Sequence, residues 1–135
     1  KLKFLSESSG WKFYQQNYGD FRIYPSDNWG ICFVYEYEKG LSIWKEGITI
    51  EQKEKIKEDL IGSISDFHFI DNEFHNNTTY VMAFNQNQEL MFKDEDEFAW
   101  EANNTNLFDT IANILKPHLN EETRKMFLEI NNKLE

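Results

Sequence analysis

Residues 29–46 read WGICFVYEYEKGLSIWKE, and this stretch decides the fold. In its first half the odd-numbered residues from 31 to 37 fall on one face, and the even-numbered residues from 32 to 38 fall on the other. A period of two with β-branched and aromatic side chains is typical of a strand. Lys39-Gly40 offers a short turn, and residues 41–44 begin a return strand. The sequence therefore predicts a central β-hairpin.

The even-numbered face of the first strand changes character along its length. Cys32 and Val34 are apolar, whereas Glu36 and Glu38 are acidic. Apolar side chains favour burial and carboxylates favour water. The strand is therefore predicted to start in the core and to run outward, leaving Glu36 and Glu38 at the surface.

The rest of the chain supplies further strands and three amphipathic helices. Strand patterns recur at residues 11–15, 21–24, 66–70, 79–84 and 89–92. Helices are predicted at residues 50–61, 107–115 and 121–134. Thr49 and Gln52 form a capping box before the first helix, Pro117 stops the second, and Asn120 caps the third.

These elements predict one α+β domain spanning residues 1–135. A chain of 135 residues fits a single domain and is long enough to bury a core. The expected architecture is an antiparallel β-meander of about five strands. One helix is inserted midway, and two C-terminal helices pack on the sheet.

The charge balance bears on the class of partner. The chain has 24 acidic and 14 basic residues, for a net charge of -10. Binding to nucleic acid needs Lys and Arg against the phosphates, so this balance argues against direct nucleic-acid binding. It favours a protein partner with a basic surface, or it serves solubility alone.

The sequence contains few residues that indicate catalysis or metal binding. Cys32 is the only cysteine, which predicts a reducing compartment such as the cytoplasm, and its apolar neighbours indicate a buried structural thiol. His68, His75 and His118 lack metal-ligand spacing, and no nucleotide loop or nucleophile elbow is present. The sequence predicts no metal, no cofactor and no recognisable catalytic group. It also predicts no signal peptide and no transmembrane segment.

The candidate site is a partner-binding surface. A second acidic run, residues 94–97, follows the strand predicted at 89–92. If this run converges with the acidic end of the hairpin strand, the two form one negative patch. A nearby tryptophan could then act as an anchor of the kind that dominates interface energetics. The predicted partner-binding residues are Glu36, Glu38, Trp44, Asp94, Glu95, Asp96, Glu97 and Trp100.

Aromatic and glycine placement gives a resemblance to a known superfamily. The segments at residues 11–25 and 29–48, with Phe98-Ala99-Trp100 before a closing helix, resemble the C-terminal half of bacterial and phage proteins of the PD-(D/E)XK nuclease superfamily. The catalytic signature of that superfamily is missing, since Pro25-Ser26-Asp27 does not supply it and Glu51-Gln52-Lys53 begins a helix. The resemblance implies a non-catalytic region, and no catalytic residue carries over.

Three interpretations of the function remain open at this point. Small acidic α+β domains also resemble immunity proteins and inhibitors, which cover the basic sites of nuclease toxins. The leading interpretation is such a non-enzymatic binding domain. The alternatives are an accessory C-terminal domain of a nuclease-like protein and an enzyme of unrecognised type.

Overall fold

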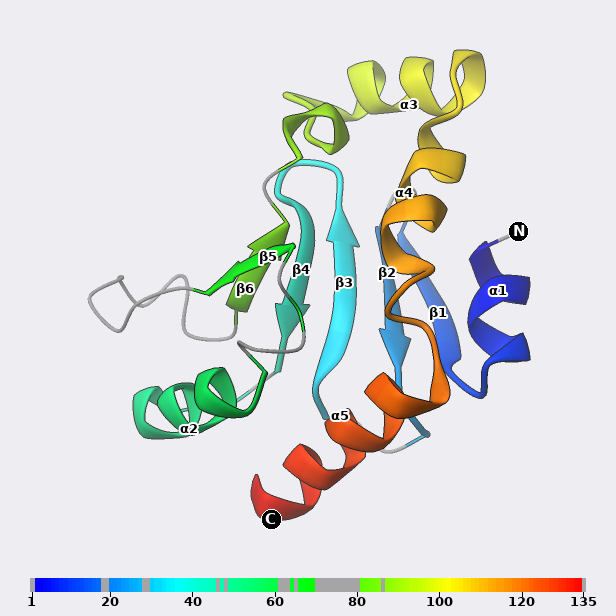
Figure 1. Cartoon of the computed structure of the whole chain (residues 1–135). Coiled ribbons are helices and arrows are strands. Elements are labelled where there is room, and N and C mark those ends of the chain that lie inside the picture. Colours follow the sequence, from blue (N-terminus) through cyan, green and yellow to red (C-terminus); the bar gives the residue numbers. More distant parts are fainter. Residues whose placement is uncertain are drawn as a thin grey trace.

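An antiparallel sheet forms the centre of the computed structural model, which describes residues 2–17, 20–27, 30–45, 47, 49–60, 64, 66–69, 81–85 and 87–134. The sheet has six strands in the order β1-β2-β3-β4-β6-β5 (Figure 1). The strands are β1 (Lys12–Asn17), β2 (Asp20–Tyr24), β3 (Cys32–Glu36), β4 (Gly40–Trp44), β5 (Phe67–Phe69) and β6 (Val81–Asn85). The predicted α+β class is confirmed, because the first four strands form a meander and a helix separates β4 from β5.

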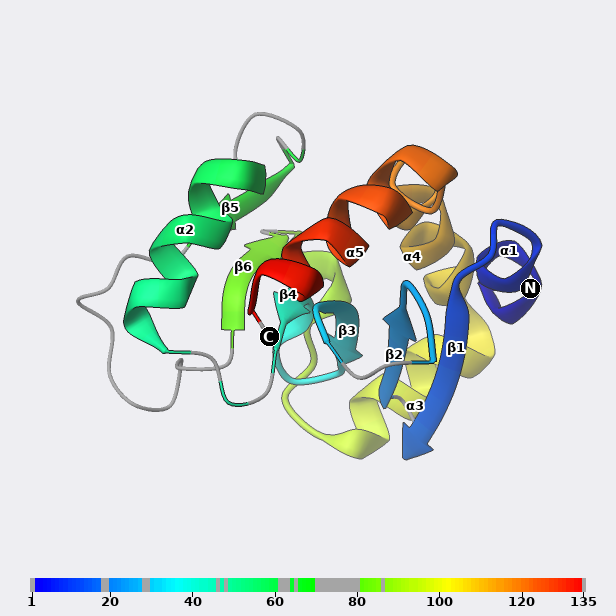
Figure 2. The same ribbon diagram turned by 90° about the horizontal axis from the view of Figure 1, so that it is seen from below.

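Helices surround this sheet. They are α1 (Leu2–Ser8), α2 (Ile50–Leu60), α3 (Glu95–Asn104), α4 (Leu107–Leu115) and α5 (Glu121–Leu134), with a short 3₁₀ helix, η2 (Gln88–Leu90). Figure 2 shows α2, α4 and α5 on the same side of the strands. In Figure 1, α3 lies at the end of the sheet where β3 turns into β4.

The predicted hairpin is the centre of the sheet. β3 pairs with β4 from Cys32↔Trp44 to Glu36↔Gly40. The turn lies at residues 37–39, slightly before its predicted place, and Gly40 takes a φ of +77° that other residues rarely adopt. Tyr37 and Glu38 were expected in the strand but lie in this turn.

The two faces of β3 are as predicted. Phe33 and Tyr35 are fully buried in the main core beneath the helices. Cys32 and Val34 face the other side, where they pack with Tyr24 and the partly buried Trp44. The Phe33 ring lies 5.1 Å from that of Phe127 on α5, so the strand and the C-terminal helix share one aromatic core.

The helix caps follow the sequence pattern. The Gln52 N–H donates to the Thr49 hydroxyl at 3.1 Å, and the Thr49 N–H donates to the Gln52 side chain at 3.0 Å. The Asn120 side chain accepts the Thr123 N–H at 2.8 Å at the start of α5. Both caps satisfy backbone donors that the helix itself leaves unpaired, and both were predicted.

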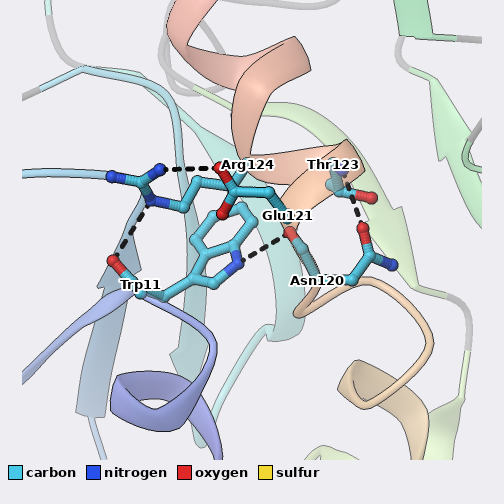
Figure 3. A network of polar contacts seen from close by, with 6 residues as sticks. Trp11, Asn120, Glu121, Thr123 and Arg124 are labelled. Carbon is cyan, nitrogen blue, oxygen red and sulfur yellow. Dashed lines mark hydrogen bonds and ion pairs between the residues drawn. The ribbon is translucent and has the colours of Figure 1, made fainter.

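Polar contacts fix α5 to the sheet at two points. Near its start, the Trp11 indole donates to the Asn120 carbonyl at 3.2 Å, and Arg124 Nε donates to the Gly10 carbonyl at 3.2 Å (Figure 3). Near its end, the Asn131 side chain accepts the Ile31 N–H at 2.9 Å. The entry to β1 and the entry to β3 are thereby held by the same helix.

The prediction was wrong between residues 88 and 97. Residues 89–92 were expected to form a strand, but Gln88–Leu90 is the 3₁₀ helix η2, with no strand pairing at 89–92. The acidic run at 94–97 was not assigned to a helix from the sequence, and it forms the cap and first turn of α3. Acidic side chains favour the positive end of a helix dipole, which explains why this run begins a helix.

Some predictions fall outside the described residues. These are the end of the first helix at residue 61, residue 70 of the fifth predicted strand, and residues 79–80 of the next. The N-terminal helix α1 was not predicted. It packs Leu2 into the core, and the Ser6 hydroxyl donates to the Leu2 carbonyl at 2.8 Å.

Candidate partner-binding surface

The segment before α3 is attached to the β3–β4 turn by its backbone. The Phe92 N–H donates to the Tyr37 carbonyl at 2.7 Å. The Tyr37 ring lies 5.8 Å from the Phe98 ring of α3. One buried hydroxyl adds to this attachment, because Tyr35 donates to the Leu90 carbonyl at 2.8 Å. The two acidic stretches of the sequence are therefore brought to the same end of the molecule.

The electrostatic environment of Tyr37 agrees with this convergence. The pKa of the Tyr37 hydroxyl is raised. The largest cause is a hydrogen bond with Glu38, and desolvation and the negative charges of Glu38, Glu95 and Asp20 raise the pKa further. These carboxylates come from the turn, from α3 and from β2. Three separate parts of the chain therefore place negative charge within reach of one hydroxyl.

A shallow hollow lies at the turn itself. It has a volume of about 270 Å³ and is lined by Asp20 and by residues 36–39. Lys39 is the cation of this group, and its ammonium lies 3.6 Å from Glu36 Oε2. Both side chains of that ion pair are more than a third exposed, so the pair leaves the surface accessible to water.

The four acidic residues at the start of α3 divide into two roles. Asp94 is the N-cap, and its Oδ1 accepts the Glu97 N–H at 2.8 Å. Glu95, Asp96 and Glu97 are exposed in the first turn of the helix. Asp94 therefore stabilises the helix, while the other three present their charge to solvent.

An exposed tryptophan follows these carboxylates on α3. Trp100 is 60% exposed. It lies four residues after Asp96 and three after Glu97, a spacing that places all three side chains on one helix face. A large aromatic side chain in water beside a charged group is typical of an interface anchor.

The other predicted tryptophan lies elsewhere. Trp44 pairs with Cys32, at the end of the hairpin opposite the Glu36↔Gly40 pair. The Arg22 guanidinium covers its ring at 4.3 Å from the centroid, a cation–π contact. The structure thus brings together the acidic residues and Trp100, and it leaves Trp44 on the second face of the sheet.

We use the term acidic end for the charged residues gathered here. They comprise nine carboxylates and two lysines: Asp20, Glu36, Glu38, Glu89, Asp94, Glu95, Asp96, Glu97 and Glu101, with Lys39 and Lys93. Glu89 and Glu101 were not identified from the sequence. They join this group because η2 and α3 both line a second hollow, separate from the one at the turn.

A histidine–carboxylate pair was also missed by the sequence analysis. His118 Nε2 lies 2.8 Å from Asp66 Oδ1, although the residues are 52 positions apart. The imidazole packs edge-on against Phe67, at 5.8 Å between centroids. This pair fixes the start of β5 to the connection between α4 and α5. His68 is exposed, and His75 lies outside the described residues.

The described residues contain no group of three or more His, Cys, Asp or Glu side chains that could hold a metal ion. None of the helices in the described part of the chain is long and apolar enough to cross a membrane. Comparison of the chain with protein-family models, with curated proteins and with solved structures gave no match.

Cys32 is buried on the second face of the sheet, as predicted. Its thiol donates to the Trp44 carbonyl at 3.6 Å. Burial raises the pKa of the Cys32 thiol from 9.0 to about 12, and the Arg22 charge and the hydrogen bond with Tyr24 offset only part of this effect.

Thiol labelling tests this placement. Since the thiolate is the reactive form, we expect Cys32 in the native protein at pH 8 to react at least about a hundredfold more slowly than in denaturant. The rate is measured with a chromogenic disulfide reagent. Native labelling as fast as that of the unfolded chain would show that this face of the sheet is open.

Proposed function

We propose that this chain is a non-enzymatic binding domain whose acidic end covers a basic surface of a protein partner. Its closest functional analogy is to immunity and inhibitor proteins that cover the basic site of a nuclease toxin. The observation that carries the proposal is the attachment of the α3 segment to the β3–β4 turn at Tyr37, which brings the carboxylates of both to one end of the molecule, with Trp100 exposed on α3.

Electrostatics explains why such a surface suits this role. Complementary charges steer the partners during diffusional encounter and exclude partners of like charge. The charge is also concentrated, since the acidic end holds nine of the 24 acidic residues and only two of the 14 basic ones. A surface evolved for solubility alone needs no such segregation.

The exposed Trp100 side chain supplies binding affinity that surface charge alone does not. Exposed ion pairs add little affinity, whereas a tryptophan that becomes buried at the centre of an interface contributes strongly. Trp100 lies on a helix held by the Asp94 cap and by Phe98, which is fully buried. Its backbone is fixed before the partner arrives, which lowers the entropy that binding must overcome.

Charge reversal tests the proposal. One variant is Glu36→Lys with Glu38→Lys, and a second is Asp96→Lys with Glu97→Lys. Asp94 is left unchanged because it caps α3. Each variant, and the wild type, is immobilised and exposed at low salt to an extract of the source cells. We expect the wild type to retain a basic protein that high salt releases, and both variants to lose it.

The matched control carries the same charge change elsewhere. Glu58 on α2 and Glu129 on α5 are exposed, and Figure 1 shows both helices away from α3, towards the other end of the sheet. Glu58→Lys with Glu129→Lys should retain the partner like the wild type. Circular dichroism verifies that all variants are folded. If the two acidic-end variants retain the same protein in the same amount as the wild type, the proposal is wrong.

A further inference from the structure

A second and larger hollow lies beside the acidic end, between η2, α3 and the start of α4. Its volume is about 500 Å³, within the range of ligand-binding pockets. The apolar part of the lining is formed by Phe92 and Leu107, which are almost fully buried, and by Met91, which is exposed. The Phe92 ring packs at 5.8 Å against Phe98, so this part of the lining is firmly held.

The polar groups that line this hollow are mainly acceptors. Glu89 and Glu101 contribute carboxylates. The Thr105 hydroxyl donates its proton to the Glu101 carbonyl at 2.7 Å, and the Thr110 hydroxyl donates to the Asn106 carbonyl at 3.2 Å. Each hydroxyl has one proton and two lone pairs, so both oxygens retain only acceptor capacity for an incoming group.

One feature of the hollow favours the opposite charge. It opens at the N-terminus of α4, where Asn106 makes no capping hydrogen bond with its side chain. A helix N-terminus is equivalent to about half a positive charge, whereas the two glutamates carry two full negative charges. The carboxylates therefore dominate, and the hollow favours a cation over an anion.

These properties match one side chain best. Arginine has five N–H donors, no acceptor, and a planar group that pairs with carboxylates. Its aliphatic stem can cover apolar surface while the charged head reaches the rim. Lysine offers three donors on a compact ammonium and lacks the planar face.

We infer that this hollow binds an arginine side chain from a basic segment of the partner. The inference rests on the proposed function, because it assigns one pocket within the same binding surface. The volume exceeds that of a single arginine, so the hollow has room for the residues next to it in the segment.

A small-molecule probe tests the pocket without the partner. Nα-acetyl-L-arginine N-methylamide is titrated into the ¹⁵N-labelled protein, and the citrulline analogue serves as the uncharged control. We expect saturable shifts of the Thr105, Leu107 and Thr110 amide signals, with a dissociation constant of about 1–10 mM for a ligand of this size. The citrulline analogue should produce no saturable shift at these amides.

Variants of the two lining glutamates test whether the probe binds in this hollow. Glu89→Gln with Glu101→Gln should weaken the probe at least tenfold, and Glu58→Gln with Glu129→Gln should leave it unchanged. The pocket assignment is overturned if the first variant binds the probe like the wild type, or if the shifts spread over the acidic end without saturating at the hollow.

The same variant in the partner assay separates the two proposals. If Glu89→Gln with Glu101→Gln retains the partner fully while the charge-reversal variants lose it, the pocket assignment fails and the proposed function stands. If none of these variants loses the partner, both fail.

Discussion

Replacing Trp11 with alanine is expected to lower the free energy of unfolding by about 3–5 kcal/mol. Trp11 is 0% exposed. Its ring packs at 5.6 Å from Phe33 and 5.3 Å from Phe127, and its indole N–H donates to the Asn120 carbonyl. The substitution removes the largest side chain from the contact between β3 and α5. Urea unfolding followed by circular dichroism measures the loss.

This loss would be a large share of the total, since domains of this size are stable by about 5–15 kcal/mol. Two variants provide the comparison. Trp11→Phe keeps part of the aromatic packing but removes the indole N–H that donates to the Asn120 carbonyl. Its loss of stability should therefore be intermediate. Phe4→Ala removes a ring that is 78% exposed and should change stability by less than about 0.5 kcal/mol. A Trp11→Ala effect as small as that of Phe4→Ala would contradict the packing described.

The second large effect is expected at Trp100. Trp100→Ala should weaken partner binding about 30-fold or more, corresponding to a hot-spot contribution of about 2 kcal/mol. Its stability should stay close to that of the wild type, because the side chain is 60% exposed and the helix cap at Asp94 is intact. Isothermal titration calorimetry with the retained partner measures the affinity.

The control for Trp100 is again Phe4→Ala, an exposed aromatic residue on α1, outside the acidic end. It should bind the partner with wild-type affinity. Unchanged affinity in the Trp100→Ala variant would remove Trp100 from the interface and leave only charge to support the proposed surface.

The sequence predicted those parts of the fold that depend on local patterns. The hairpin followed from its period of two, and α2, α4 and α5 followed from apolar stripes with caps at Thr49 and Asn120. These signals lie within a few residues of the element they specify. The 89–92 segment shows the limit, because its path depends on Tyr35 and Tyr37, more than 50 positions away.

The candidate site was predictable only in part. Glu36, Glu38 and residues 94–97 stand out as acidic in the sequence, but their convergence depends on the attachment of Phe92 and Phe98 to Tyr37. One missed feature did have a local signal. Asp94 followed three residues later by Glu97 fits the capping pattern that begins a helix. Glu89 and Glu101 have no such signal, since only the tertiary fold brings them to one hollow.

Association kinetics with the partner test the central claim most directly. The association rate of the wild type should fall at least about tenfold between 0.02 M and 0.5 M salt, because screening removes long-range attraction. At low salt, the Glu36→Lys/Glu38→Lys and Asp96→Lys/Glu97→Lys variants should already associate near the slow high-salt rate, while Glu58→Lys/Glu129→Lys follows the wild type. Wild-type rates and an unchanged salt dependence in both acidic-end variants would contradict the account.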